Sequence, residues 1–281
     1  MTFQWGSRTY VMGIVNVTPD SFSGDGVPEI ETAVEQGIQM EKDGADILDI
    51  GGESTRPGST PVTLEEELSR IIPVVEHLAK RVHIPLSIDT YKSEVARRAI
   101  QAGASIVNDV WGGAMEPDIL KVAAEKNVPI VLMHNRSKPK DLAQEEKLGG
   151  RYVGVAYKDL IGDIKRELQI SVDAALAAGI KKENIIVDPG IGFGKTVEQN
   201  LELVKHLDEI RELGYPLLAG PSRKSFVGYT LDLPPDDRLE GTLAAVTLCI
   251  QKGADIVRVH DVKEACRVAR FVDAVVRSRQ K

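Results

Sequence analysis

The chain has 281 residues, 42% hydrophobic and 27% charged, which suits one large domain or two small ones with an ample core. Its formal net charge of −7 at pH 7 argues against a nucleic-acid partner or an anionic membrane surface, and no apolar stretch approaches the length of a membrane span. Cys249 and Cys266 have no metal-ligand neighbours and the N-terminus has no basic region followed by an apolar run, so we expect a cytoplasmic protein.

Short apolar strands alternate with amphipathic helical stretches along the whole chain. The predicted strands cover Tyr10–Val15, Asp46–Ile50, Pro85–Ile88, Ser105–Val107, Pro129–Met133, Ile185–Val187, Pro216–Ala219 and Asp255–Val259. The predicted helices cover Ile30–Asp43, Leu64–Lys80, Lys92–Ala102, Pro117–Lys126, Tyr152–Ala178, Val197–Leu213, Arg238–Lys252 and Val262–Ser278. Eight such units predict a single α/β domain over residues 1–281, a (β/α)8 TIM barrel. A doubly wound open sheet is the alternative, but the eight similar units show no switch in pattern.

The C-terminal ends of the predicted strands carry polar and charged residues. In barrels of this kind the chemistry lies at these ends, where the side chains of all eight strands converge on one mouth. The residues concerned are Asn16, Glu53, Asp89, Asn108, Asp109, His134, Asp188, Lys224, Arg258 and His260. We therefore interpret this ring as the lining of a binding or catalytic site.

The loops after the first two strands are long and rich in glycine and proline. The first, residues 16–28, carries the single aromatic residue Phe22 among small polar residues, which favours a lid that closes over substrate. The second, residues 51–61, has Arg56 at its centre. An arginine there suits a clamp for phosphate or carboxylate, and a solvated loop arginine is nearly as good an interpretation.

The third, fourth and fifth strands each end in a candidate side chain. Asp89 lies at the rim, and Thr90 or Ser93 is expected to cap the following helix. Asn108 offers a donor and an acceptor side by side, as an amide or pyrimidine edge requires. His134 has no partner at metal-ligand spacing, so we interpret it as a hydrogen-bonded structural histidine. The charged residues 137–150 show no strand pattern and predict a mobile surface loop.

The segment 184–196, NIIVDPGIGFGKT, combines a buried strand with a carboxylate and three glycines. Asp188 ends the strand, Pro189 stops the ladder, and the glycines let the backbone pass close to a flat or bulky group. A phosphate P-loop would need glycine at Pro189, and a dinucleotide fingerprint would need its third glycine at Lys195. The loop is therefore neither of these common nucleotide sites.

The last two strand ends concentrate positive charge. Ser222 and Lys224 follow a Gly-Pro turn after the seventh strand, and Arg258 and His260 stand two residues apart on one face of the eighth. Loops after strands seven and eight are the usual phosphate site of these barrels. Lys224, Arg258 and His260 therefore form the best candidate anion-binding cluster.

Seven segments at the strand ends together resemble dihydropteroate synthase of folate biosynthesis. In order they are MGIVNVTPDSFSGDG, DIGGESTRPG, SIDTYK, VNDVWGG, VDPGIGFGKT, PSRKSF and RVHD, and they cover nearly the whole chain. The resemblance implies a homodimeric (β/α)8 barrel with small-molecule substrates. The implied reaction joins 6-hydroxymethyl-7,8-dihydropterin pyrophosphate to p-aminobenzoate, with Mg2+, and gives 7,8-dihydropteroate and pyrophosphate.

The resemblance also implies roles at the pterin ring. Asp188 would accept both adjacent N–H donors of the aminopyrimidine edge, as a bidentate carboxylate does. Asn108 and Asp89 would bind the remaining ring edges, and Lys224 the O4/N5 side. Gly220 and the glycines after Asp188 would let the flat ring lie against the backbone.

For the other two substrate groups the resemblance implies a second set of residues. Arg258, His260 and Asn16 would hold the pyrophosphate, with Mg2+ near Asn16. The p-aminobenzoate pocket would be shaped by Thr55, Arg56, Pro57, Phe22, Phe193 and Ser222. The first loop reads SGDG where many members have SDGG, which moves its acidic residue by one place, to Asp25.

The implied mechanism is a dissociative substitution that needs no strong base, because the aniline nitrogen is already neutral at pH 7.

Two other functions are compatible with a pterin barrel. A methyltetrahydrofolate–corrinoid methyltransferase has no pyrophosphate to bind, so the cluster of Lys224, Arg258 and His260 weighs against it. A non-catalytic pterin-binding protein would be expected to lack loop residues such as Arg56 or Phe22, and both are present.

Overall fold

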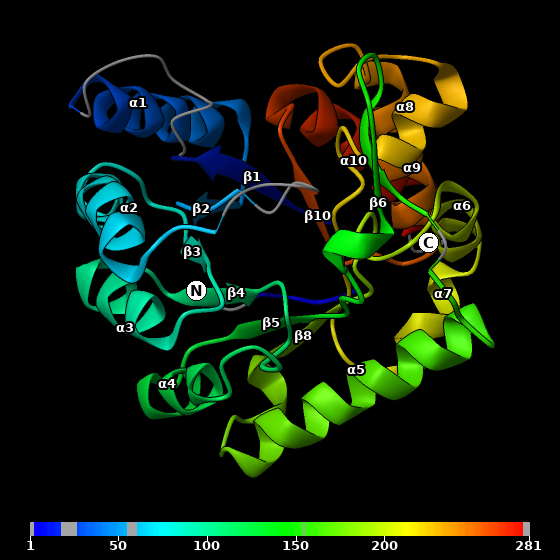
Figure 1. The fold of residues 1–281 in the computed structure, drawn as a ribbon. Helices are drawn as coiled ribbons and strands as arrows, with labels where there is room; N and C mark the ends of the chain where they lie inside the picture. Colours follow the sequence, from blue (N-terminus) through cyan, green and yellow to red (C-terminus); the bar gives the residue numbers. More distant parts are fainter. Residues whose placement is uncertain (1–2, 18–26, 55–60, 154, 278–281) are drawn as a thin grey trace.

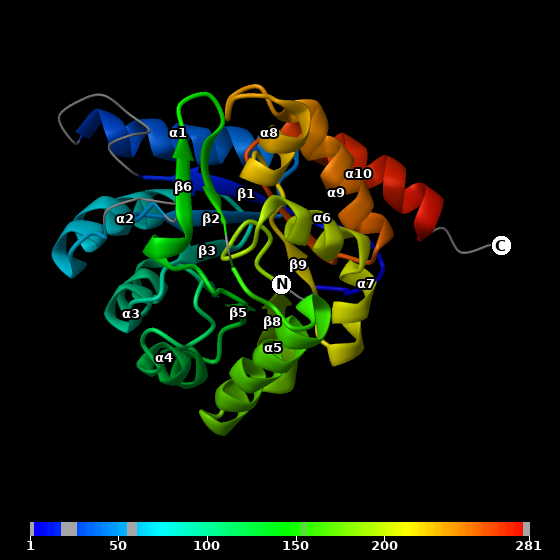
Figure 2. The same cartoon turned by 45° about the vertical axis from the view of Figure 1, so that its right-hand side comes forward.

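Eight parallel strands surrounded by helices form a (β/α)8 barrel in a computed structural model that describes residues 3–17, 27–54, 61–153 and 155–277 (Figures 1 and 2). The strand order in the sheet is β8-β5-β4-β3-β2-β1-β10-β9. An isolated parallel bridge between Val187 and Leu217 joins the two ends of this order and closes the barrel. The predicted fold class is confirmed.

The barrel strands lie within one or two residues of their predicted bounds. They are β1 Tyr10–Asn16, β2 Ile47–Gly51, β3 Leu86–Asp89, β4 Ile106–Asp109, β5 Ile130–Met133, β8 Ile185–Asp188, β9 Leu218–Ala219 and β10 Ile256–Val259. Short strands suffice because each is buried on both sides, between the barrel interior and the helices.

The helices of the described residues depart from prediction in several respects. They are α1 Val27–Asp43, α2 Leu64–Leu78, α3 Ser93–Ala102, α4 Asp118–Lys126, α5 Leu160–Ala177, α6 Val197–Lys205, α7 Leu207–Ile210, α8 Ser225–Leu231, α9 Leu239–Gln251 and α10 Val262–Val276. Helix α5 begins eight residues after the predicted Tyr152, because Asp159 caps it by accepting from the Gly162 N–H. The predicted helix over residues 197–213 is interrupted at His206, and the short helix α8 was not predicted. Helix α3 lacks the expected side-chain cap, since Lys92 precedes its first residue, Ser93.

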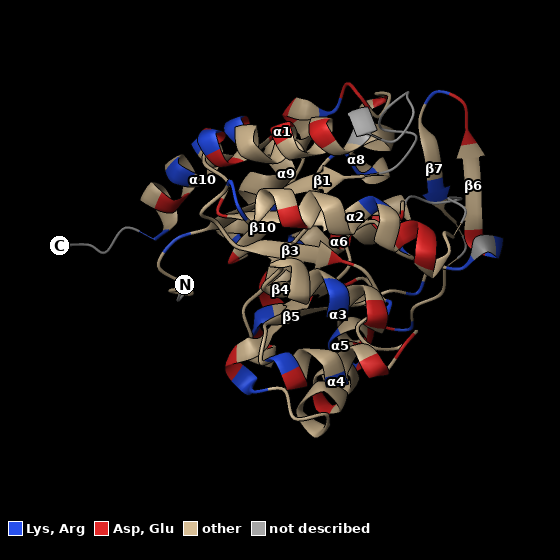
Figure 3. Cartoon of the chain, turned by 90° about the vertical axis from the view of Figure 1, so that its left-hand side faces the viewer, with Lys and Arg blue, Asp and Glu red and all other residues tan. Residues whose placement is uncertain are grey.

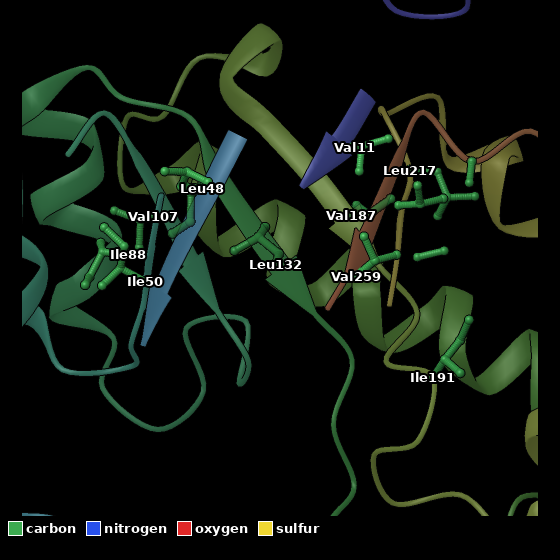
Figure 4. Packing of buried hydrophobic residues seen from close by; sticks show 14 of the residues in the cluster. Val11, Leu48, Ile50, Ile88, Val107, Leu132, Val187, Ile191, Leu217 and Val259 are labelled. Atoms are coloured by element: carbon green, nitrogen blue, oxygen red, sulfur yellow. The ribbon is translucent and has the colours of Figure 1, made fainter. Parts of the chain in front are cut away.

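Alternation along each strand separates two cores. Inward residues fill the barrel interior, where Met12, Ile47 and Ile186 belong to one buried cluster. Their neighbours in sequence, such as Leu48 and Val187, point outward and pack under the helices (Figure 4). Because successive strand residues face opposite sides, the inward positions nearer the C-terminal ends lie directly above the interior core. These positions carry the polar side chains of the site.

Residues 142–152 form an antiparallel hairpin, so the expectation of a mobile loop without strands is wrong for this segment. Strands β6 Leu142–Glu145 and β7 Gly149–Tyr152 pair from Leu142↔Tyr152 to Glu145↔Gly149. The hairpin stands at one end of the barrel, outside the helix layer (Figure 3). Tertiary bonds hold it: Arg238 donates to the Leu148 carbonyl at 2.9 Å, and the Tyr229 hydroxyl to the Gly149 carbonyl at 3.0 Å.

Among the described residues, no helix is both long enough and apolar enough to cross a membrane.

Candidate active site

A cavity of about 490 Å³ opens at the C-terminal ends of the barrel strands, and most of the predicted site residues that the structure describes line it. These residues are Asn16, Asp89, Asn108, Asp188, Phe193, Gly220, Ser222, Lys224, Arg258 and His260. Glu53 of the predicted ring also lines it. The predicted loop residues Phe22, Asp25, Thr55, Arg56 and Pro57 lie outside the described residues.

One arginine links two carboxylates at the base of the cavity. Arg258 donates from Nε to Asp49 at 2.6 Å and from Nη2 to Asp89 at 2.5 Å. Asn108 donates from Nδ2 to the same Asp49 oxygen at 2.8 Å. The four side chains come from β2, β3, β4 and β10 and all face inward. They form a connected polar layer directly above the apolar interior.

Asp49 is absent from the predicted ring, because it lies within β2 rather than at its end. It is fully buried, and its Oδ1 has no hydrogen-bond partner among the described residues. The sequence signal for Asp49 was a carboxylate between Leu48 and Ile50. A buried charge within an apolar strand requires a partner, and the alternation along the strand directs this side chain into the barrel.

Asp89 carries the strongest electrostatic perturbation of the cavity carboxylates. Burial, opposed by the positive charge of Arg258 and reinforced by the negative charge of Asp49, raises its pKa to about 7. Near neutral pH, Asp89 can therefore be either acceptor-only or a donor, which suits a group that must match a heterocycle edge.

Asp188 lies at the end of β8, opposite Met133 of β5. Its Oδ1 accepts the Gly190 N–H at 2.7 Å. Burial raises the Asp188 pKa to about 6, against the lowering effects of this bond and of Lys224. Gly190 has φ 71°, and a Cβ there would lie 1.9 Å from the His134 carbonyl oxygen, so only glycine fits this turn.

Lys224 and Phe193 form a wall of the cavity beside Asp188. The Lys224 ammonium lies 3.9 Å from the centroid of the Phe193 ring, within range of a cation–π interaction. Both residues follow strand ends, Phe193 in the glycine loop after β8 and Lys224 immediately before α8. The cavity thus offers a flat aromatic face with a positive charge above it.

His260 and Ser222 pair across the loops after β10 and β9. The Ser222 Oγ lies 3.0 Å from His260 Nδ1 and accepts the His260 backbone N–H at 3.2 Å. Burial, together with the positive charges of Arg258, Arg223 and Lys224, lowers the His260 pKa to about 3. His260 is therefore neutral at pH 7. With the Ser222 hydroxyl donating to Nδ1, its Nε2–H remains as a donor.

Two residues of the predicted ring do not line the cavity. Asp109 accepts the N–H groups of Trp111 and Gly113, at 2.9 and 2.6 Å, and so stabilises the turn after β4. His134 is buried and bonds Glu167 through Nε2 at 3.0 Å and Lys195 through Nδ1 at 3.0 Å. These contacts agree with the interpretation of His134 as a structural histidine.

The β6–β7 hairpin supplies a wall that sequence reasoning missed. Leu148, Gly149 and Gly150 line the cavity from the hairpin, and Pro235 and Arg238 line it from the segment between α8 and α9. Arg238 is buried and donates to three backbone carbonyls, those of Leu148, Arg223 and Leu233. The Gly-Gly pair that opens β7 was the available signal, since it permits close approach of the backbone.

Comparisons with known proteins agree with this geometry. A family model described as pterin binding enzyme matches residues 12–260. A dihydropteroate synthase of Clostridium beijerinckii is 50% identical over 277 residues, 98% of this chain and 97% of that protein. The solved structure of a Clostridium difficile dihydropteroate synthase in the presence of pteroic acid has a TM-score of 0.90 at 45% identity, covering 99% of this chain and 100% of that one. The Xanthomonas albilineans dihydropteroate synthase in complex with 7,8-dihydropteroate has a TM-score of 0.84 at 41% identity, covering 97% and 95% of the two chains. The chain therefore belongs to the pterin-binding enzyme family, and within it to the dihydropteroate synthases.

Proposed function

We propose that the chain joins 6-hydroxymethyl-7,8-dihydropterin pyrophosphate to p-aminobenzoate through the cavity residues named above. The observation that carries the proposal is the convergence of Asp89, Asn108, Asp188 and Lys224 on one cavity from four strand ends. Two carboxylates, an amide and an ammonium match the alternating donors and acceptors of a pterin ring.

The pterin lies with its aminopyrimidine edge on Asp188. Adjacent ring N–H donors need two acceptor oxygens, which an ionised carboxylate provides. Asn108 and Asp89 bind the other polar edges, and Lys224 donates to the O4/N5 side. Gly220 and the glycine loop leave room for the ring to approach the backbone, and Phe193 offers it a flat apolar neighbour.

The pyrophosphate binds toward Arg258, His260 and Asn16, which line the same cavity. Arg258 is preorganised, because Asp49 and Asp89 each hold one of its nitrogens. His260 contributes a neutral N–H donor. Ser222 and Phe193 contribute to the p-aminobenzoate pocket, a role that we also propose for Phe22, Thr55, Arg56 and Pro57, and we propose a role in catalysis for Asp25.

The reaction is a dissociative substitution. The C–O bond between the pterin methylene and the pyrophosphate breaks, and the electron pair leaves with the pyrophosphate, whose charge Arg258 and His260 stabilise. The electron-rich pterin stabilises the methylene cation. The neutral arylamine attacks it and then loses a proton to water. The contribution of the chain is therefore positioning and charge stabilisation, with no nucleophile–base pair required.

Magnesium is the metal that the reaction implies. Asn16 lines the cavity at the end of β1 and offers an amide oxygen, a hard ligand that suits Mg2+. The described residues contain no group of three or more His, Cys, Asp or Glu side chains that could hold a metal ion alone. This donor set fits an ion held by one amide oxygen, water and substrate phosphates. The bound ion would neutralise charge on the leaving pyrophosphate.

We further propose a cytoplasmic homodimer in which residues 1–281 act as one domain. Support for the dimer comes from α9 and α10, which expose several large apolar side chains, namely Leu248, Phe271, Val275 and Val276. Phe271 is 72% exposed, which is unfavourable unless another surface covers it. The family match over residues 12–260 supports the single domain.

A turnover assay tests the proposal. The purified protein is mixed with the dihydropterin pyrophosphate, p-aminobenzoate and Mg2+, and pyrophosphate and dihydropteroate are followed by mass spectrometry. We expect both products to appear in equal amounts. Pterin binding without either product would favour a non-catalytic binding protein. Methyl transfer from methyltetrahydrofolate to a corrinoid, with no dihydropteroate, would favour the methyltransferase.

A further inference from the structure

Lys195 is the largest fully buried side chain of the described residues that carries a charge, and it lies behind the glycine loop rather than in the cavity lining. Its ammonium donates to three acceptors: His134 Nδ1 at 3.0 Å, the Gly190 carbonyl at 2.9 Å and the Phe193 carbonyl at 3.0 Å. A lysine ammonium has three donors, so the three bonds satisfy it completely.

The partners of Lys195 connect it to helix α5. Because His134 Nδ1 accepts from Lys195, the ring hydrogen lies on Nε2 and is donated to Glu167 at 3.0 Å. Glu167 is held in turn by Arg136, whose Nε donates to it at 3.0 Å. A continuous polar chain thus runs from α5 to the glycine loop. Such a network fixes geometry only when every member is satisfied, as here.

The two loop carbonyls that Lys195 holds belong to the residues that shape the pterin side of the cavity. Gly190 donates its N–H to the Asp188 carboxylate, and Phe193 carries the ring that lies against Lys224. Loss of the ammonium would leave both carbonyls buried without this donor. The free-energy cost of these unsatisfied carbonyls would destabilise the loop conformation that presents Asp188 and Phe193.

We infer that Lys195 is a positioning residue for the pterin: through the Gly190 and Phe193 carbonyls it fixes the loop that presents Asp188. The inference rests on the proposed role of Asp188 as the pterin acceptor.

The charge effect supplies a test that distinguishes positioning from simple structural support. Burial lowers the pKa of Lys195 to about 7, with Asp188 and Glu167 raising it and Arg136 and Lys224 lowering it, and neutral His134 in contact. Lys195 is therefore mainly charged below pH 7, the range in which Asp188 titrates. Burial raises the pKa of Asp188 to about 6, and the Gly190 N–H and the positive charges of Lys224, Lys195 and Arg258 oppose this rise. Asp188 must be ionised to accept two N–H groups, so pterin affinity falls as the pH drops through the Asp188 pKa. Removal of Lys195 raises that pKa, and the fall should begin at a higher pH.

The experiment measures the Kd of the dihydropterin pyrophosphate by calorimetry between pH 5 and 8 for the full chain and for Lys195→Met. The matched control is Lys165→Met. It removes from α5 an ammonium that pairs with the exposed carboxylate of Glu212. We expect Lys195→Met to bind about tenfold more weakly or worse at pH 7. We also expect its acid midpoint to move to higher pH, with the control unchanged in both. Equal affinity, or weaker binding with an unmoved midpoint, would overturn the inference.

A second pair of variants covers the case in which Lys195→Met does not fold. His134→Asn places an amide oxygen close to where Nδ1 accepts from Lys195, and His134→Leu removes that acceptor. We expect the asparagine variant to keep more of the pterin affinity than the leucine variant. Equal affinities of the two would contradict the inference. If the parent chain itself failed to bind the pterin, the proposed function would fail instead.

Discussion

Asp49 and Arg258 meet at 2.6 Å although 209 residues separate them in the sequence. The contact joins the interior of β2 to β10, on either side of β1. The Arg258 side chain is 15% exposed and that of Asp49 is not exposed at all, so little water screens the pair. Asp49 thereby fixes the guanidinium that the proposed mechanism places next to the leaving group.

Replacement of Asp49 by Asn should lower the free energy of unfolding by about 2 kcal/mol, since it leaves a buried guanidinium with one charged partner fewer. Urea denaturation measures the change. Asp208→Asn is the control, because Asp208 pairs with Lys252 at a half-exposed site and should change stability by less than about 0.5 kcal/mol. Similar effects of the two substitutions would contradict the role of the buried pair.

Asp188→Asn should fold normally but bind the dihydropterin pyrophosphate about 30-fold more weakly or worse, because an amide offers one acceptor where the pterin needs two. Calorimetry at pH 7 gives the affinity, and a cooperative thermal transition checks the fold. Normal pterin affinity in this variant would remove the central assignment of the proposed function.

The burial of His134 should make the free energy of unfolding depend on pH. Burial lowers its pKa to about 3, with a smaller effect of Lys195, so the folded state keeps it neutral where the unfolded chain binds a proton. The unfolded state binds more protons between about pH 6.5 and pH 3, so this group destabilises the fold increasingly as pH falls through that window. At pH 5 the cost is about 2 kcal/mol.

The measurement is urea denaturation of the parent and of His134→Asn at pH 8 and pH 5. We expect the asparagine variant to lose less stability between the two values than the parent does. A parent and variant with the same loss would show that His134 is not held neutral.

Arg238→Met should loosen the β6–β7 hairpin, because Arg238 holds the Leu148 carbonyl. Hydrogen exchange over residues 142–152 should accelerate relative to the parent chain. Lys147→Ala is the control, since it removes only an exposed ion pair of the hairpin with Asp232. Unchanged exchange in Arg238→Met would mean that other contacts hold the hairpin.

Phe271→Glu should disrupt the proposed dimer, because it puts a charge into an exposed apolar surface of α10 that another copy would cover. Light scattering after gel filtration should then give the mass of one chain, 30.6 kDa, instead of twice that value. Ile170→Glu, at a 62% exposed position of α5, should leave the mass of the parent. A parent that is already monomeric would refute the dimer.

The alternation of inward and outward residues along buried strands explains which parts of the fold and the site could be predicted from the sequence. It predicted the barrel and placed Asp89, Asn108 and Asp188 at one mouth, because a strand end fixes both depth and direction. Asp49 was missed because only strand ends were taken as site positions, and Asp49 lies within β2. The alternation also missed the hairpin, whose strands form through Arg238 and Tyr229 from distant parts of the chain. Asp109 was wrongly predicted to line the site, because its strand-end carboxylate instead accepts the Gly113 N–H of the turn that follows.

The closing bridge of the barrel has a mechanical consequence. Val187 and Leu217 join β8 to β9 through an isolated bridge, so this is the thinnest seam of the barrel wall in its described part. Asp188 stands immediately above one side of the seam, and Gly220 and Lys224 stand above the other. A pterin ring bound by both Asp188 and Lys224 would link the two strands that this single bridge joins. Occupancy of the site would then stabilise the barrel where the fewest strand-to-strand contacts hold it.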